Sequence, residues 1–191
     1  FQFGRGRESW GAGNDIQLGL SENSSSYDYG MLDLDFGNLR VRYFNGYLET
    51  DSLSVNRYIT GRGFEWNNKK NFLFALSEVV IYSGKNRLLD FSYLNPISTH
   101  LEIELNDKHN DLGTDSGNGI WQLSMDYLFR KSLKFSFNYL IDEFVLDKVQ
   151  REANKNNEGG YSFKILYSPY GLGKHNLSNF YFSTIKIGTN T

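Results

Sequence analysis

The clearest pattern in the chain is an alternation of apolar and polar residues with period two, which is typical of β-strands with two chemically different faces. In residues 121–129 and 133–141 the odd-numbered side chains are apolar and the even-numbered ones are mainly polar. The same alternation recurs in residues 16–20, 32–36, 39–43 and 161–167. Residues 71–82 are apolar on both faces, so their orientation stays open. The pattern predicts an all-β chain.

The connections between these runs alternate in length. Short turns are expected at residues 35–39, 67–70, 130–132 and 169–175, and longer polar connections at residues 50–56, 106–118 and 148–159. If Asn95 and Pro96 form a further turn, residues 97–105 become a strand, and only the short connection at 83–86 breaks the alternation. The chain then has about eleven strands, with the short and long connections at opposite ends, as in outer-membrane barrels.

Two all-β architectures remain open, a soluble β-sandwich and an antiparallel transmembrane β-barrel. In a sandwich the apolar faces pack together, whereas in a barrel they meet lipid and the polar faces line the lumen. Strand length, charges of both signs on the polar faces and aromatic residues near strand ends favour the barrel. These aromatic residues are Phe36, Tyr43, Tyr82, Phe129 and Tyr167. In the barrel, Phe135, Phe137 and Tyr139 face lipid, and Lys134, Ser136 and Asn138 face the lumen.

Composition removes several classes of function. Tyr 13, Phe 15 and Trp 3 make up 16% of the 191 residues, while alanine occurs only three times, which argues against a helical bundle. A net charge of −2 offers no basic surplus for nucleic acid. With Cys 0 and His 3, and no G-x-S-x-G motif, we assign no catalytic residue, metal site or cofactor. We assign His109, between Asp107 and Asp111, to a solvated loop rather than to a metal site.

Charged residues on the polar faces have a structural explanation. Asp33 and Asp35 lie opposite Arg40 and Arg42 across a tight turn, so we expect cross-strand ion pairs in the lumen rather than a Ca²⁺ site. Glu78 interrupts an otherwise apolar run. Because a bare charge on a lipid face is costly, we expect Glu78 to face the lumen or to pair with an arginine.

Five ordered motifs carry a resemblance to a known family. They are residues 11–21, 33–39, 75–82, 93–97 and 140–144, of which Ser77-Glu78-Val79-Val80 and Tyr93-Leu94-Asn95-Pro96 are the most specific. In these motifs the chain resembles the capsule-assembly outer-membrane proteins of the Wzi type, especially the divergent versions of Bacteroidetes-like bacteria. The resemblance implies a barrel of about eighteen strands in the outer membrane, so residues 1–191 are expected to form part of one barrel domain of a longer protein.

The resemblance also implies a function. It points to a non-enzymatic protein that assembles or attaches surface polysaccharide, in contact with outer-membrane lipid and with other envelope proteins. A barrel scaffold of a secretion or gliding complex is the alternative, and a soluble β-sandwich binding module is a more distant one. Aromatic rings suit sugar stacking, and the glycine-flanked Arg62 suits an anionic group. The expected polysaccharide-binding residues are Tyr27, Tyr29, Arg62, Trp66 and Tyr170.

Overall fold

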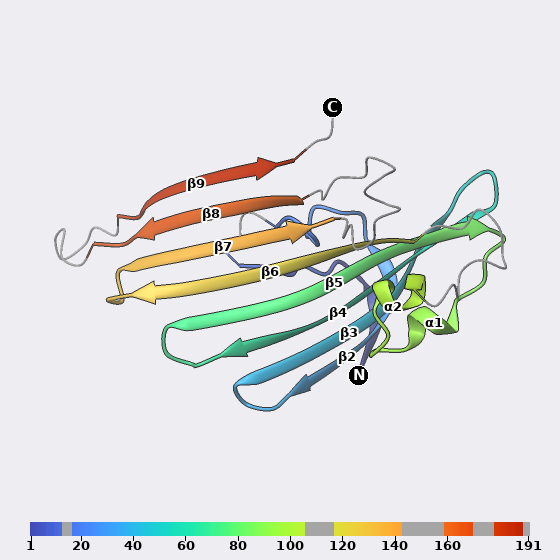
Figure 1. The fold of residues 1–191 in the computed structure, drawn as a ribbon, viewed down its shortest axis with the longest axis horizontal. Helices are drawn as coiled ribbons and strands as arrows, with labels where there is room; N and C mark the ends of the chain where they lie inside the picture. Colours follow the sequence, from blue (N-terminus) through green and yellow to red (C-terminus); the bar gives the residue numbers. More distant parts are fainter. Residues whose placement is uncertain (13–16, 106–116, 143–158, 170–177, 189–191) are drawn as a thin grey trace.

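The computed structural model describes residues 1–12, 17–105, 117–142, 159–169 and 178–188. It contains one sheet of nine antiparallel strands, in which every strand pairs with its neighbours in sequence, from β1 at one edge to β9 at the other (Figure 1). The strands are β1 (Gln2–Gly6), β2 (Tyr27–Asp35), β3 (Leu39–Thr50), β4 (Val55–Asn67), β5 (Phe72–Lys85), β6 (Gly117–Phe129), β7 (Leu133–Ile141), β8 (Gly159–Tyr167) and β9 (Phe180–Ile187). The all-β antiparallel prediction is confirmed.

The meander places its short and long connections at opposite ends. Tight turns join β2 to β3, β4 to β5 and β6 to β7 at the end that we call the turn end (Figure 1). The first of these turns uses Gly37 at φ 82, and the Asp35 carboxylate accepts the Gly37 N–H at 2.7 Å. The connections from β1 to β2, β5 to β6 and β7 to β8 are long, and the strand ends that they join lie at the opposite end, which we call the loop end. The β3–β4 connection was expected to be long, at residues 50–56, but β3 and β4 pair as far as Thr50 and Asn56, so that only residues 51–54 connect them and this connection is short.

The region expected to form a strand at residues 97–105 is helical instead. The structure has α1 (Phe91–Leu94) and α2 (His100–Leu105) between β5 and β6. Asp90 caps α1 by accepting the Ser92 N–H at 2.9 Å, and Thr99 accepts the Glu102 N–H at 3.2 Å. These local caps satisfy helical N–H groups that a strand would need to pair with a neighbour. Within the described residues, neither helix is long and apolar enough to cross a membrane.

Two other expectations about strands change. Within the described residues the sheet has nine strands rather than about eleven, partly because residues 91–94 and 100–105 are helical. Residues 17–20 form no extended strand; their last residue, Leu20, makes only an isolated bridge to Trp10. The open orientation of residues 71–82 is also settled, because Val79 packs on one face of β5 while Val80 and Tyr82 pack on the other.

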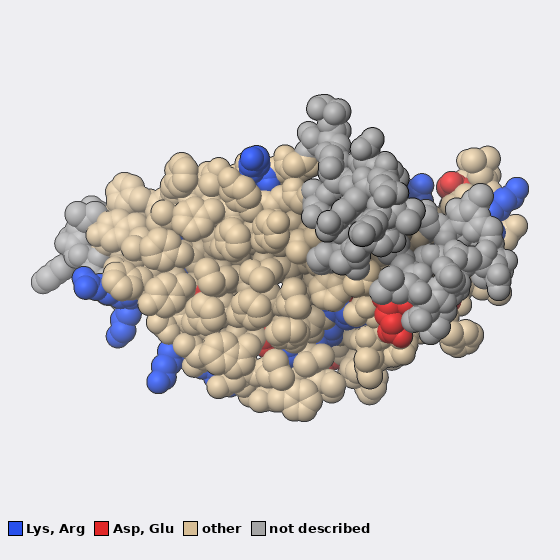
Figure 2. Space-filling view, in the orientation of Figure 1, with Lys and Arg blue, Asp and Glu red and all other residues tan. Residues whose placement is uncertain are grey.

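The two faces of the sheet differ in chemistry, as the alternation in β6 to β8 predicts. The polar face carries Gln122, Ser124, Asp126, Ser136, Asn138, Ser162 and Lys164. The apolar face carries Phe64, Trp66, Leu123, Met125, Phe135, Phe137, Tyr139, Tyr161 and Phe163. In Figure 2 the surface in view is largely uncharged over the strands, and most Lys and Arg side chains lie toward its rim. Toward the loop end, residues 7–12 and 17–26 cover the polar face and residues 87–105 cover the apolar face.

Candidate functional site

The polar face holds a chain of buried, hydrogen-bonded side chains across β6, β7 and β8. Gln122 Nε2 donates to Ser124 Oγ at 3.0 Å, and Ser124 Oγ donates to Asn138 Oδ1 at 2.8 Å. Asn138 Nδ2 in turn donates to Ser162 Oγ at 3.0 Å. Since a buried polar group without a partner is costly, this chain stabilises the polar interior that it occupies.

The two amide side chains of this chain, Asn138 and Gln122, also bind the backbone of described residues in the β1–β2 connection. Asn138 accepts the Ala12 N–H at 2.7 Å and donates to the Ala12 carbonyl at 2.8 Å. Gln122 accepts the Gly19 N–H at 2.7 Å and donates to the Trp10 carbonyl at 3.0 Å. The sequence predicts that Asn138 faces the lumen; in the structure its side chain is bound and covered by Ala12 of the β1–β2 connection. The described parts of this connection, residues 7–12 and 17–26, thus lie inward over the sheet at Trp10, Ala12 and Gly19.

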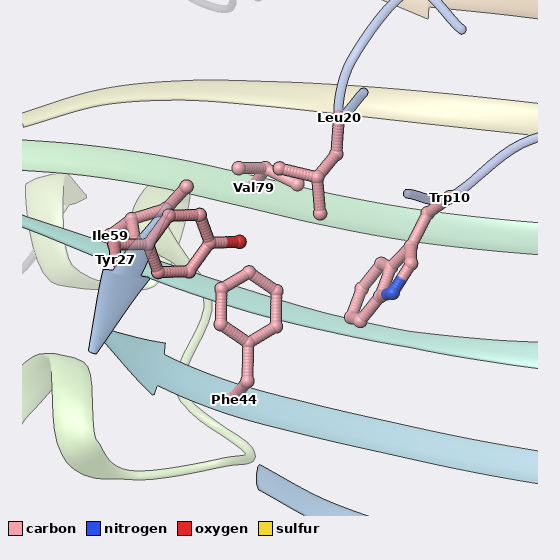
Figure 3. Close-up of a cluster of buried hydrophobic side chains, with 6 residues drawn as sticks. All are labelled: Trp10, Leu20, Tyr27, Phe44, Ile59 and Val79. Carbon is pink, nitrogen blue, oxygen red and sulfur yellow. The ribbon is translucent and has the colours of Figure 1, made fainter. Parts of the chain in front are cut away.

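An aromatic cluster anchors the same connection. Trp10 lies edge-on to Phe44 with ring centroids 5.3 Å apart, and the Arg42 guanidinium lies 4.9 Å from the Trp10 ring centroid. Figure 3 shows Trp10 and Leu20 beside side chains from β2, β3, β4 and β5. Next to Trp10, Gly11 has φ 141 and would place a Cβ 2.6 Å from Gln122 Nε2, so the backbone here requires glycine.

Beside this cluster, at the loop end, lies a cavity of about 580 Å³. Its floor is apolar and its rim carries hydroxyl and amide groups. The floor includes Leu48, Ile59, Val79, Ile81 and Ile120, and the rim includes Ser21, Asn23, Ser24, Ser25, Ser26 and Asn118. Tyr27 and Glu49 also line it. An apolar surface beside hydroxyl and amide groups suits a ligand with one apolar face and many hydroxyl groups, such as a sugar ring.

The structure brings together only two of the expected polysaccharide-binding residues. Tyr27 is buried in the cavity wall, and Tyr29 is half-buried beside it with the rings 5.9 Å apart. Trp66 is 40% exposed, but it lies on the apolar face at the turn end. Arg62 is buried on the apolar face beneath residues 87–105 and is not open to a surface ligand. Tyr170 lies outside the described residues. The serine-rich rim was not expected, because its hydroxyl groups give no periodic signal.

The expected lumen ion pairs are present only in part. Arg40 forms an ion pair with Asp33 on the polar face. Asp35 instead caps the adjacent turn, and Arg42 stacks on Trp10. Glu78 pairs with an arginine, as expected, but it lies on the apolar face rather than on the polar face that was expected to line the lumen.

A buried ion pair on the apolar face is the second polar site. Arg62 Nε lies 3.1 Å from Glu78 Oε2, and both side chains are almost completely buried. Glu78 Oε1 accepts the His100 N–H at 3.0 Å, and Arg62 Nη1 donates to the Asn95 carbonyl at 3.2 Å. The expectation that Glu78 pairs with an arginine is confirmed. The alternation of apolar and polar residues could not predict that the strand register places Arg62 directly opposite Glu78. It also could not predict the helical cover over both residues.

Comparison with known proteins adds no relative. No protein-family model, curated protein or solved structure matches the chain. In the described part of the chain, no group of three or more His, Cys, Asp or Glu side chains is placed to hold a metal ion. The chemistry of the two faces and of the cavity therefore carries the functional argument.

Proposed function

We propose that the nine strands form part of the wall of an outer-membrane β-barrel, with the apolar face toward lipid and the polar face toward the lumen. The observation that carries the proposal is an inversion of the burial expected in water. Asn138 is 1% exposed, whereas its neighbour Tyr139 is 44% exposed; Ser162 is 2% exposed, whereas Tyr161 is 38% exposed. The buried side of these strands is polar and the exposed side is aromatic.

An exposed aromatic face is more favourable in contact with lipid than in contact with water. Burying an aromatic or aliphatic side chain of this size is worth roughly 1.5–3 kcal/mol, so a face with many exposed ones is unfavourable in water. The same face is favourable against acyl chains, provided that every backbone group within the membrane is paired. The nine described strands leave β1 and β9 each with a partner on one side only. The proposal therefore requires further strands to close the sheet, in accord with the larger barrel that the resemblance implies.

The cavity supports a role in holding surface polysaccharide. It opens among residues of the loop end, which faces outward in a barrel with short periplasmic turns. Its apolar floor can receive the C–H face of a sugar ring, and its serine and asparagine rim can bond to hydroxyl groups. Sugar hydroxyls are already well hydrated, so each contact is weak, and retention follows from many repeats of one polymer binding many copies of the protein. We propose that the protein holds the polymer without cleaving it.

The experiment replaces the cavity rim in the full-length protein. A strain lacking the gene is complemented with the wild type, with Ser25→Trp, which adds a bulky ring at an exposed rim position, or with Lys70→Trp, the matched control at the turn end. We expect equal amounts of all three proteins in the membrane, and shed rather than cell-attached polysaccharide only for Ser25→Trp and for the deletion. Normal attachment in the deletion strain would refute the role. If secretion or motility were lost instead, the scaffold alternative would replace it.

A further inference from the structure

The ion pair between Arg62 and Glu78 lies on an unexpected face of the sheet. Both side chains project from the face that the proposed function places against lipid, where an uncovered charge is strongly unfavourable. The pair is nevertheless almost completely buried, so something other than lipid or water surrounds it. Removing one partner from a pair in such surroundings is far more damaging than replacing both.

The cover is residues 87–105, which contain α1 and α2. Tyr93 stacks on Tyr82 of β5 with ring centroids 4.2 Å apart, and the Tyr43 hydroxyl donates to the Tyr93 carbonyl at 3.0 Å. The His100 N–H and the Asn95 carbonyl then bind the two charged side chains directly. The inner side of the cover therefore packs closely against the sheet, with Tyr93 0% and Ile103 1% exposed.

The outer side of the cover is also apolar. Leu88 is 81%, Phe91 86% and Ile97 84% exposed, and none of them packs into either buried cluster. A cover that served only to shield an ion pair from water would be expected to present polar groups outward. Exposed charged residues do occur on and beside this segment, namely Glu102 and Lys85.

Continuity with the sheet identifies what this outer surface meets. The cover lies at the loop end, over Tyr58, Val80 and Tyr82, and toward the turn end the apolar face continues with exposed Phe64 and Trp66. One apolar surface thus runs from the turn end across the strands and onto the cover. Apolar side chains accompanied by charged ones at the edge of such a surface are typical of elements that lie in the interfacial layer of a bilayer.

Building on the proposed barrel, we infer that residues 87–105 are an interfacial membrane element. Leu88, Phe91 and Ile97 insert into the lipid at the outward-facing leaflet, at the level where the headgroups meet the acyl chains. At this end the cover, rather than lipid, lies against the apolar-face side chains of β4 and β5, among them Tyr58, Val80 and Tyr82. It also allows an ion pair to persist on the lipid side of the wall.

Residues 1–191 contain no cysteine, so a single introduced cysteine is a unique labelling site within this part of the protein. Single variants Phe91→Cys and Ile97→Cys are labelled with bimane in the full-length protein and reconstituted into phosphatidylcholine vesicles that contain lipid with a nitroxide near the headgroup or deep in the acyl chain. Phe137→Cys is the control for the proposed lipid face, and Lys69→Cys, at an exposed turn, is the control for water. Because Phe91 and Ile97 are more than four-fifths exposed, their substitution leaves the packing unchanged.

We expect the shallow nitroxide to quench labels at positions 91 and 97 at least twofold more than the deep one, and iodide to quench them several-fold less than the label at position 69. Iodide quenching at 91 and 97 equal to that at 69, with lipid quenching retained at 137, would overturn the interfacial element and leave the barrel standing. Protection from both lipid nitroxide and iodide would assign the surface to a second copy of the chain and also overturn it. Loss of lipid quenching at 137 would overturn the barrel proposal and the inference together.

Discussion

Asn138→Ala is the sharpest perturbation of the polar face. Asn138 binds both the N–H and the carbonyl of Ala12, at 2.7 and 2.8 Å, and bridges Ser124 to Ser162. Ala12 is 2% exposed, so the substitution leaves two buried backbone groups without this partner. An unsatisfied buried polar group costs about 1–3 kcal/mol, while the two serine hydroxyls can rotate toward other acceptors. We therefore expect the free energy of unfolding to fall by about 2–6 kcal/mol.

The measurement is equilibrium urea unfolding of the full-length protein in detergent micelles, followed by intrinsic fluorescence. Trp10 lies on the connection that Asn138 anchors, and its carbonyl is bound by Gln122 on the same face, so its environment reports on this region. The matched control is Asn118→Ala, an exposed asparagine of β6 on the same face, for which we expect a change within about 0.5 kcal/mol. Equal effects of the two substitutions would refute the argument that Asn138 anchors the inward-folded connection.

Three further predictions concern the charged pairs and the apolar face. Arg62→Met should destabilise the protein by about 3–5 kcal/mol, because it leaves Glu78 buried without its cation. Adding Glu78→Leu should restore most of this loss in the same unfolding assay. If the double substitution restores nothing, lost packing rather than the unpaired charge causes the destabilisation. The exposed pair of Asp33 and Arg40 should give a coupling of only about 0.2–1 kcal/mol in a double-mutant cycle, and a larger value would place that pair in a drier environment. Phe137→Arg should cost about 2–4 kcal/mol when folding is measured into lipid vesicles, and a negligible cost would count against lipid at that position.

The strands and their two faces could be predicted because alternation is a local property. In β7, for example, the sequence alone correctly separates Phe135, Phe137 and Tyr139 from Ser136 and Asn138. The tight turn at Gly37 was predictable for the same reason, since glycine tolerates its positive φ. Which face meets lipid is not a local property and stays a prediction.

The helical cover was missed although it carries a local signal. Thr99 and Glu102 have the spacing of a helix capping box, and the Thr99 side chain does accept the Glu102 N–H. The apolar residues Leu101 and Ile103 nevertheless also fit a strand with period two, and that interpretation was favoured by the alternation of connections. Short elements of this kind are decided by tertiary contacts, here the stacking of Tyr93 on Tyr82.

The candidate cavity could not be predicted because its walls come from distant parts of the chain. Leu48, Ile59, Val79 and Ile120 belong to four strands, and the rim combines residues from 21–26 with Asn118 of β6. Tyr27 was identified from its chemistry alone, as were Trp66 and Arg62, which the structure places elsewhere. The chemistry of a residue suggests that it could bind a sugar, but the strand register determines which of the candidate side chains lie close together.

A nitroxide scan along β7 tests the central claim, that the apolar face meets lipid, most directly. Single cysteines at positions 133–141 of the full-length protein in vesicles would be spin-labelled, and their exposure to oxygen in the lipid and to a water-soluble nickel chelate would be compared. We predict a period of two, with odd positions reached by oxygen and protected from the nickel chelate, and even positions protected from oxygen. Odd positions as open to the nickel chelate as a label at Lys69 would contradict the proposed barrel wall.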